Sequence, residues 1–379
     1  MIYRIKTKNI CYFSFTDWHE FFIIIQLICN YGELSMKRRN FMQGAIASSL
    51  IPAAFSSNLI QFPSTGIIKP KALNAGDTVG IVAPGSAVSD PIDINKVYEV
   101  MDYLDLNVKF AKHVIKGTGY KTRTIEERVS DLHDMFSDSS ISGIFCIRGG
   151  YGSAQLLDRL DYDMIKSNPK VFLGFSDITA LHNAIHQETG LVTFHGPVLL
   201  SDFSDYTMKH LQKAVFSAEP TGRISNPDGL SGVRENYPIL TITPGIARGR
   251  LTGGNLSIIT SLMGTPYEID VKDKILFIED VGEAPYRIDR MLTQMRLAGK
   301  LKARGIVFGL CSGCDSSNST TWDYSLGEVL KNILSTAGVP TFYGLTFGHT
   351  SDQLTLPMGV EVEINSEEGS VNIMEAGVI

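Results

Sequence analysis

Residues 171–179, Val-Phe-Leu-Gly-Phe-Ser-Asp-Ile-Thr, decide the fold of this chain. The apolar run at the start of this stretch predicts a short buried strand that ends at Gly174. An amphipathic helix is predicted to begin at Asp177. Ser176 therefore lies on a tight turn between a strand and a helix.

Ser176 has two interpretations on this local pattern. A serine on such a turn can act as a nucleophile, because the helix N–H groups beside it can stabilise an oxyanion. It can equally be an ordinary N-cap that accepts a hydrogen bond from the helix. The residues after it do not complete the Gly-x-Ser-x-Gly pattern of common hydrolase turns, so both interpretations stay open at this point.

Strands and helices alternate around this unit from residue 66 to residue 200. The alternation predicts an N-terminal α/β domain with a Rossmann- or flavodoxin-like parallel sheet, whose ligands bind at the carboxyl ends of the strands. The loops at 84–86 and 148–152, Ser176 and His195 all fall at such ends, so we expect one cleft to gather them. The predicted strands are 78–83, 108–111, 141–147, 171–173 and 191–194, and the predicted helices are 92–104, 124–136, 153–160 and 177–185.

The pattern changes after a linker at 201–234, which includes a predicted helix at 206–216. Strands then follow with fewer helices between them, which predicts a second, smaller, mixed α+β domain at 235–379. The predicted strands here are 247–254, 275–278, 305–308, 354–358 and 360–364, and the predicted helices are 286–298 and 326–335.

The first 65 residues differ from the rest and are interpreted as a leader. Arg38-Arg39 and Phe41 precede a modest apolar run with a small-residue exit, which resembles a twin-arginine export signal at 36–58. We expect Met36 to be the true start, 1–35 to be a misread upstream stretch, and the protein to be periplasmic. The alternatives are a disordered or membrane-facing tail and a cytoplasmic protein.

The amino-acid composition limits the kinds of partner that this protein is expected to bind. The chain has 379 residues, a net charge of −6 and 44% hydrophobic residues, which is typical of a globular protein and gives no electrostatic footprint for nucleic acid. No stable membrane insertion is expected after signal removal. The sequence is compatible with a homodimer but does not fix the oligomeric state.

Cysteine and histidine pairs give weak metal signals. Cys311 and Cys314 have redox or half-zinc-site spacing, but no second cysteine pair or nearby histidine completes a site. We interpret them as small residues of a strand-end loop and leave open whether they pair. His182 and His186 are interpreted as helix surface. No metal or cofactor is expected.

Three further features could carry chemistry. The loop 148–152, Arg-Gly-Gly-Tyr-Gly, lacks the Lys-Ser/Thr of a P-loop and the spacing of a dinucleotide site, so its N–H groups suit an oxyanion. Glu279 and Asp280 end an apolar strand, and His349 follows a glycine in a loop. The order Ser…Glu…His is that of acyl-transfer triads.

These motifs together resemble the LD-carboxypeptidase family, the murein tetrapeptide carboxypeptidases, which are grouped with the microcin C self-immunity peptidases as serine peptidases. The resemblance runs from Lys69 to the C-terminus and preserves motif order. It implies an α/β domain and a smaller C-terminal domain, with Ser176 as nucleophile, Glu279 as orienting carboxylate and His349 as general base. The motifs are 79–86, 148–152, 174–179, 195–197, 253–256, 277–283 and 348–349.

The resemblance implies hydrolysis of the L-to-D amide bond of a murein tetrapeptide, with release of D-alanine. The expected oxyanion donors are the backbone N–H groups of Gly150 and Asp177. Arg148 or Arg287 is expected to bind the terminal carboxylate, although an arginine at a helix start can be structural.

Three further residues are candidates for contact with this substrate. Asn255 is a candidate hydrogen-bonding residue, although its Gly-Gly-Asn context equally suits a turn. Glu283 or Asp289 is expected to bind the diamino acid before the scissile bond.

Two rival functions use the same cleft. A microcin C-type immunity peptidase would act on a peptidyl-nucleotide with the same triad and would need an aromatic platform for the base. A non-catalytic muropeptide-binding protein would keep the cleft without needing Ser176. Family members commonly work in the cytoplasm, and the leader of this chain departs from that pattern.

Overall fold

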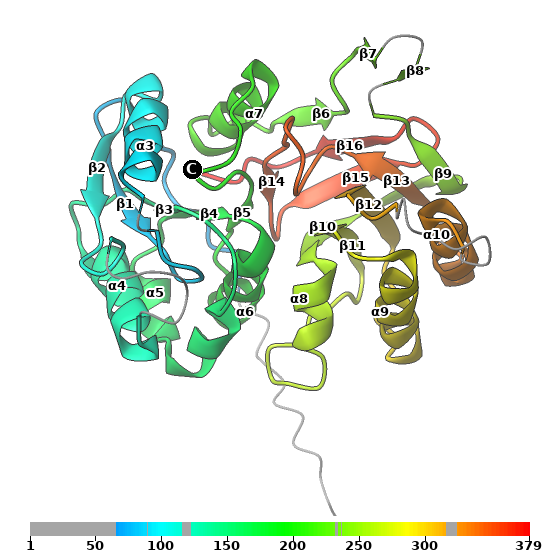
Figure 1. Ribbon diagram of the computed structural model, residues 1–379, viewed down its shortest axis with the longest axis horizontal. Helices are drawn as coiled ribbons and strands as arrows, with labels where there is room; N and C mark the ends of the chain where they lie inside the picture. Colours follow the sequence, from blue (N-terminus) through cyan, green and yellow to red (C-terminus); the bar gives the residue numbers. More distant parts are fainter. Residues whose placement is uncertain (1–65, 89, 116–122, 232–233, 236, 316–323) are drawn as a thin grey trace, which may run out of the picture. The chain divides into compact units, whose positions relative to one another are not determined.

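The computed structural model of the protein describes residues 66–379 apart from 89, 116–122, 232–233, 236 and 316–323 (Figure 1). The leader predicted at 1–65, with its start at Met36 and its signal at 36–58, lies outside the described residues. Within the described part of the chain, no helix has both the length and the apolar character that a membrane span requires.

The first sheet has six strands in the order β14-β5-β4-β3-β1-β2. Strands β1 to β5 pair in parallel, and β14, from late in the chain, pairs antiparallel with β5. The order β2-β1-β3-β4-β5 is flavodoxin-like and leaves a crevice at the carboxyl ends of β1 and β3, where the winding reverses. The predicted α/β fold is confirmed. The strands are β1 (Thr78–Val82), β2 (Asn107–Phe110), β3 (Gly143–Cys146), β4 (Val171–Gly174), β5 (Phe194–His195) and β14 (Leu356–Pro357).

Helices cover both faces of the first sheet (Figure 1). One face carries α3, and α4, α5 and α6 lie side by side on the other. Helix α4 begins with a capping box in which Thr124 and Glu127 exchange hydrogen bonds, as expected of a threonine three residues before a glutamate. The helices are α3 (Pro91–Tyr103), α4 (Ile125–Ser137), α5 (Tyr162–Ser167), α6 (Thr179–Thr189) and, after β5, α7 (Asp205–Val215).

The second sheet has eight strands in the order β6-β16-β15-β10-β11-β12-β13-β9. Its four central strands, β10 to β13, are parallel, and antiparallel strands extend it at both sides. The strands are β6 (Gly222–Ile224), β9 (Leu240–Thr243), β10 (Ile246–Asn255), β11 (Lys274–Val281), β12 (Gly305–Ser312), β13 (Thr341–Leu345), β15 (Glu361–Asn365) and β16 (Ser370–Ile373). Its helices are α8 (Leu256–Ser261), α9 (Pro285–Leu297) and α10 (Leu326–Leu334), with a 3₁₀ turn at Ser335–Ala337.

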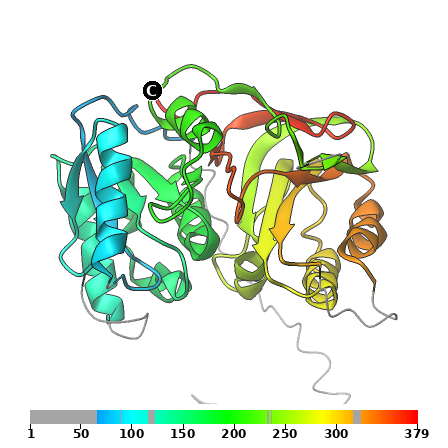
Figure 2. The ribbon, with the colours of Figure 1, turned by 45° about the horizontal axis from the view of Figure 1, so that its top comes forward.

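Alternating side chains of the second sheet divide between two hydrophobic cores, because successive residues of a strand point to opposite faces. In β11, Leu276 and Ile278 pack with α8, α9 and α10. Ile275 and Phe277 instead join the core of the first sheet. The two sheets therefore share one continuous core, and Figure 2 shows them side by side.

Several elements differ from the sequence prediction. The strand predicted at 191–194 is the two-residue β5 preceded by an isolated bridge between Leu191 and Ile68. The helix predicted at 153–160 is a 3₁₀ helix, Ser153–Arg159. In the predicted linker, α7 matches the helix expected at 206–216, and β6 and a small hairpin of β7 (Leu230–Ser231) and β8 (Arg234–Glu235) are additional elements. The domain limits at 200 and 235 stay predictions.

Candidate active site

Ser176 lies two residues after the end of β4 and has a strained backbone. Its φ of +64° lies in the left-handed region, which non-glycine residues rarely adopt. A 3₁₀ turn, Ser176–Ile178, leads into α6, and neither this turn nor α6 has a side-chain cap. The N-cap interpretation of Ser176 is therefore wrong. Its hydroxyl instead lies 3.1 Å from Nε2 of His349.

His349 connects Ser176 to a buried carboxylate. Nδ1 of His349 lies 2.8 Å from Oε2 of Glu279, which comes from β11 in the second sheet and is fully buried. A hydrogen bond from Nδ1–H to this carboxylate leaves Nε2 free to accept a proton from Ser176. Phe175 packs edge-on against the imidazole ring at 4.8 Å. A hydroxyl, an imidazole and a carboxylate in this order can carry out acyl transfer.

Asn255 holds the carboxylate of Glu279 in position and does not contact the pocket. It is buried and does not line the pocket, which corrects its expected contact with substrate. Its side chain donates to Oε1 of Glu279 at 3.2 Å and caps α8, and its backbone N–H donates to Oγ1 of Thr179 at 2.9 Å. Asn255 thus joins the helix after Ser176 to the carboxylate of the other sheet.

Asp280 is the second buried carboxylate of β11, and it shares the side-chain amide of Asn255 with Glu279, at 3.3 Å. It accepts hydrogen bonds from the backbone N–H and the hydroxyl of Ser257 in α8. Burial raises its pKa, and the charge of Glu279 adds to the shift. The register of β11 against β12 shifts between Ile278 and Asp280, a local irregularity that can re-aim side chains at a strand end.

The loop 148–152 packs against the turn that carries Ser176. A Cβ atom on Gly149 would lie 3.0 Å from Cβ of Ser176, so a side chain there would crowd the turn. The carboxylate of Asp177 accepts the N–H groups of Gly152 at 3.3 Å and Ser153 at 2.9 Å, which ties the loop to the turn. The N–H groups of Gly149 and Gly150 make no hydrogen bond within the described part of the chain.

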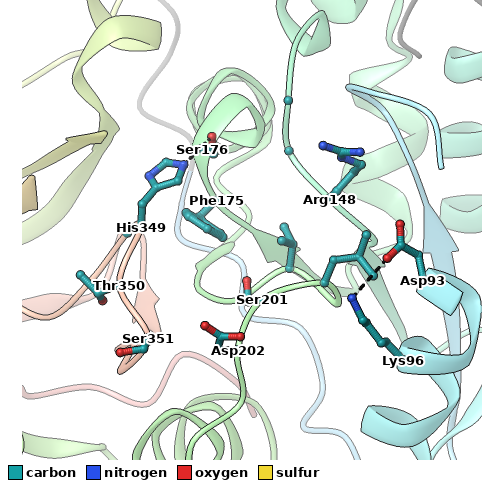
Figure 3. A pocket seen from close by; sticks show the side chains of 15 residues that line it. Asp93, Lys96, Arg148, Phe175, Ser176, Ser201, Asp202, His349, Thr350 and Ser351 are labelled. Carbon is teal, nitrogen blue, oxygen red and sulfur yellow. Dashed lines mark hydrogen bonds and ion pairs between the residues drawn. The ribbon is translucent and has the colours of Figure 1, made fainter. Parts of the chain in front are cut away.

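A pocket of about 530 Å³ opens beside Ser176 and His349 (Figure 3). Arg148 is exposed in it and makes no hydrogen bond or ion pair with another described residue. Arg287 does not line it, because its guanidinium contacts Tyr286 and Glu283 on the surface of α9. The lining residues are Asp93, Lys96, Arg148, Gly149, Gly150, Phe175, Ser176, Val198, Leu200, Ser201, Asp202, Gly348, His349, Thr350 and Ser351.

Sequence reasoning missed the charged side chains at the far side of this pocket. Lys96 and Asp93 lie on α3 and form an ion pair at 3.4 Å. Asp202 follows β5 in a loop. No motif marks these residues, since they stand in ordinary helix and loop contexts. The available signal was topological: α3 begins after β1, beside the crevice between β1 and β3.

His182 is not on the helix surface as predicted, and His186 is partly buried. His182 is fully buried and its Nε2 lies 2.8 Å from the carbonyl of Gly174, and burial lowers its pKa to about 4. His186 contacts the carbonyl of Leu191 at 3.0 Å, and burial lowers its pKa. His195, also buried, has its pKa lowered well below the usual value by burial. Burial therefore disfavours the charged form of each of these three imidazoles.

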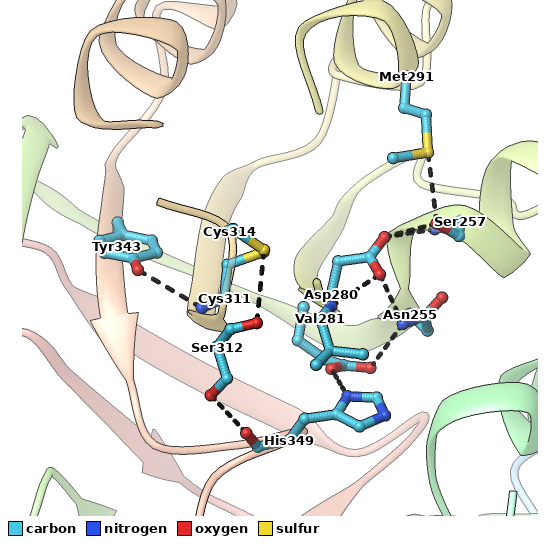
Figure 4. The surroundings of a disulfide bond; sticks show 11 residues. Asn255, Ser257, Asp280, Val281, Met291, Cys311, Ser312, Cys314, Tyr343 and His349 are labelled. Carbon is cyan, nitrogen blue, oxygen red and sulfur yellow. Dashed lines mark hydrogen bonds and ion pairs between the residues drawn. A yellow bond between two sulfur atoms is a disulfide. The ribbon is translucent and has the colours of Figure 1, made fainter. Parts of the chain in front are cut away.

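Cys311 and Cys314 form a disulfide next to the loop of His349 (Figure 4). Ser312, between them, donates its hydroxyl to the backbone carbonyl of His349 at 2.5 Å. The sequence left open whether these cysteines pair. The disulfide encloses Ser312 and so lies next to the backbone of His349. Among the described residues, no group of three His, Cys, Asp or Glu side chains could hold a metal ion.

Comparison with known families matches both halves of the chain. Residues 79–196 match the LD-carboxypeptidase N-terminal domain, and residues 248–364 match the LD-carboxypeptidase C-terminal domain. The chain belongs to the LD-carboxypeptidase family.

Named relatives match over nearly their whole lengths. A probable murein peptide carboxypeptidase of Bacillus subtilis is 41% identical over 315 residues, which are 82% of this chain and 95% of that protein. The murein tetrapeptide carboxypeptidase of Pseudomonas aeruginosa is 29% identical over 290 residues, 74% of this chain and 91% of that protein.

Solved structures of related proteins have a similar fold. The microcin C7 self-immunity protein in its apo state matches with a TM-score of 0.73 at 26% identity, covering 82% of this chain and 100% of that one. A muramoyltetrapeptide carboxypeptidase from Oxalobacter formigenes matches with a TM-score of 0.67 at 28% identity, covering 79% and 99%.

Proposed function

We propose that the protein is a serine LD-carboxypeptidase that hydrolyses the L-to-D amide bond of murein tetrapeptides and releases the terminal D-alanine. The observation that carries this proposal is the chain of contacts from Ser176 through His349 to the buried Glu279, at the edge of a pocket lined by Arg148, which has no partner among the described residues. Membership of the LD-carboxypeptidase family and the names of the relatives support the substrate.

The contacts among Ser176, His349 and Glu279 define the sequence of proton transfers in the proposed reaction. His349 takes the proton of Ser176 as Oγ attacks the scissile carbonyl, and it returns that proton to the amine of the departing D-alanine. Glu279 holds the imidazole in the required tautomer and stabilises the imidazolium. Water then repeats the cycle on the acyl-enzyme and restores Ser176.

Two further groups complete the proposed chemistry. The N–H group of Gly150, which lines the pocket without a partner among the described residues, and that of Asp177 would hold the oxyanion. One such donor typically contributes about 10²–10³ in rate. Arg148 is the first residue of the loop 148–152, two residues before Gly150. We assign its guanidinium to the terminal carboxylate of the substrate, because its fork of N–H donors suits a carboxylate.

The test of this proposal is a substrate panel. Purified protein should release D-alanine from murein tetrapeptide and leave the tripeptide product intact. A tetrapeptide with a C-terminal amide should be cleaved far more slowly, because Arg148 loses its anionic partner. Absence of D-alanine from every tetrapeptide, with binding detectable by calorimetry, would refute the peptidase and favour a muropeptide-binding protein.

The panel should include a peptidyl-adenylate analogue, because the microcin C7 self-immunity protein has the same fold. Phe175 is the one aromatic ring among the described pocket residues besides the imidazole, and it is only 7% exposed because it packs against His349. The pocket thus presents charges rather than an exposed ring, which favours the murein peptide. Faster cleavage of the adenylate analogue would reverse this choice.

We also propose that the protein is exported. The support is the Arg38-Arg39 leader together with the Cys311–Cys314 disulfide, since disulfides persist in oxidising compartments. Fractionation of cells that express the full chain should place the protein in the periplasm, and replacement of both leader arginines by lysine should retain it in the cytoplasm. Wild-type protein that stays in the cytoplasm would contradict export, and a lysine variant that still reaches the periplasm would contradict the role of the two arginines.

A further inference from the structure

The pocket holds more charge than the hydrolysis of an amide requires. Four charged side chains line it, two cationic and two anionic. Lys96 and Asp93 neutralise one another as an ion pair at 3.4 Å. Arg148 and Asp202 remain, and neither makes a hydrogen bond or an ion pair with another described residue. Both of these side chains line the pocket (Figure 3).

The spacing of Arg148 and Asp202 is fixed by the backbone. The N–H groups of Leu199 and Leu200 donate to the carbonyls of Cys146 and Ile147 at 3.2 and 3.1 Å, so the segment before Asp202 is bonded to the segment before Arg148. The chain after Asp202 is also anchored. Ser204 caps α7 and donates its hydroxyl to Asp352 at 2.5 Å. Asp202 is therefore held in place on both sides.

The proposed reaction gives Arg148 a partner but leaves Asp202 without one. The terminal carboxylate of the substrate would be repelled by Asp202, and the nitrogen of the scissile amide carries no charge. Asp202 is exposed to solvent, and electrostatic complementarity favours a ligand that places a cation against such a carboxylate. In a tetrapeptide held by its terminal carboxylate, the nearest group that can carry a cation is the side chain of the residue before the scissile bond.

We infer that Asp202 binds the side-chain ammonium of the residue that supplies the scissile carbonyl, and that it thereby selects peptides with a diamino acid at that position. This inference rests on the proposed function. It also replaces the expected roles of Glu283 and Asp289. Glu283 pairs with Arg287 at 3.4 Å, Asp289 accepts from Thr293 at 3.3 Å, and neither lines the pocket.

The test uses two synthetic tetrapeptides that end in L-lysyl-D-alanine or L-norleucyl-D-alanine and are otherwise identical. Norleucine keeps the alkyl chain of lysine and lacks the ammonium. The wild type should show a kcat/KM about 10–100-fold higher for the lysyl peptide, the range that a hydrogen-bonded charge contributes. Asp202→Asn should bring the two values within about threefold by lowering the lysyl value alone.

Asp228→Asn is the matched control, because Asp228 is an exposed aspartate that does not line the pocket. It should keep the wild-type preference. The inference is overturned if Asp202→Asn keeps that preference too, or if it lowers both peptides equally.

Binding to the Ser176→Ala variant separates this inference from the proposed function. Calorimetry should show tighter binding of the lysyl peptide when Asp202 is intact and similar Kd values for the two peptides when Asp202→Asn is added, even if no D-alanine is ever released. Equal Kd values for the two peptides with Asp202 intact would overturn the inference, whereas missing catalysis alone would overturn only the peptidase.

Discussion

The effect of a substitution at Gly348 on catalysis can be estimated from the structure. Gly348 precedes His349 with φ of +90°, and a Cβ atom there would lie 2.3 Å from Oε2 of Glu279. An ordinary contact between these atoms needs roughly 3.3 Å, so Gly348→Ala must displace the carboxylate by about 1 Å. The 2.8 Å contact with His349 would then exceed hydrogen-bonding range.

We expect Gly348→Ala to lower kcat for D-alanine release by about 10²–10⁴. The lower figure corresponds to a displacement of about 1 Å and the higher one to loss of the orienting carboxylate. The variant should also lose about 1–2 kcal/mol of stability, because alanine is strained at positive φ. Steady-state kinetics and thermal unfolding measure the two effects separately.

Gly264→Ala controls for the backbone cost. Gly264 has φ of +82°, and no described atom lies within 4 Å of the position that a Cβ atom would take, so alanine there is strained without a clash. It should lower stability to a similar extent and leave kcat unchanged. The reasoning is refuted if Gly348→Ala retains a kcat within threefold of Gly264→Ala.

Three other predictions concern stability and positioning. Burial lowers the pKa of His182 to about 4, so the stability that the neutral imidazole contributes is complete above pH 6.5 and is lost as the pH falls toward 4. The loss should reach about 3 kcal/mol. Urea unfolding at several pH values should show that the free energy of unfolding falls with decreasing pH, and His182→Asn should reduce this dependence. Reduction of the Cys311–Cys314 disulfide, which closes a four-residue loop, should lower the free energy of unfolding by about 2 kcal/mol, and an unchanged melting curve would contradict this. Asn255→Ala should cost about 1 kcal/mol as a lost cap and lower kcat at least about tenfold, whereas Ser325→Ala, the loss of the α10 cap, should cost similar stability with kcat intact.

The sequence predicted the parallel sheet because its signals are local. Short apolar runs bounded by glycine or proline, such as the one before Gly174, correspond to buried strands, and Thr124 with Glu127 marks the start of α4. The position of Ser176 at a strand end followed from the same signals. Its connection to Glu279 through His349 did not, because the two residues come from different sheets, and only the motif order placed them together.

Other features depend on partners far away in the chain. Asn255 fits a turn or a ligand site on its local sequence, and only the structure places Glu279 and Thr179 within its reach. The burial of His182 cannot be predicted from the helix alone, because it depends on the first sheet, where the imidazole contacts the carbonyl of Gly174 and the ring of Phe172. Asp202 carries no motif, since its significance comes from the unpaired Arg148 beside the same pocket.

The central claim is that Ser176 is the nucleophile. It is tested most directly by the rate of D-alanine release from murein tetrapeptide by Ser176→Ala, measured beside tetrapeptide binding to the same variant. The account predicts that kcat falls by about 10⁴–10⁶ while Kd stays near its wild-type value, because the pocket charges are untouched. A variant that binds the tetrapeptide and still releases D-alanine within tenfold of the wild-type rate would contradict it.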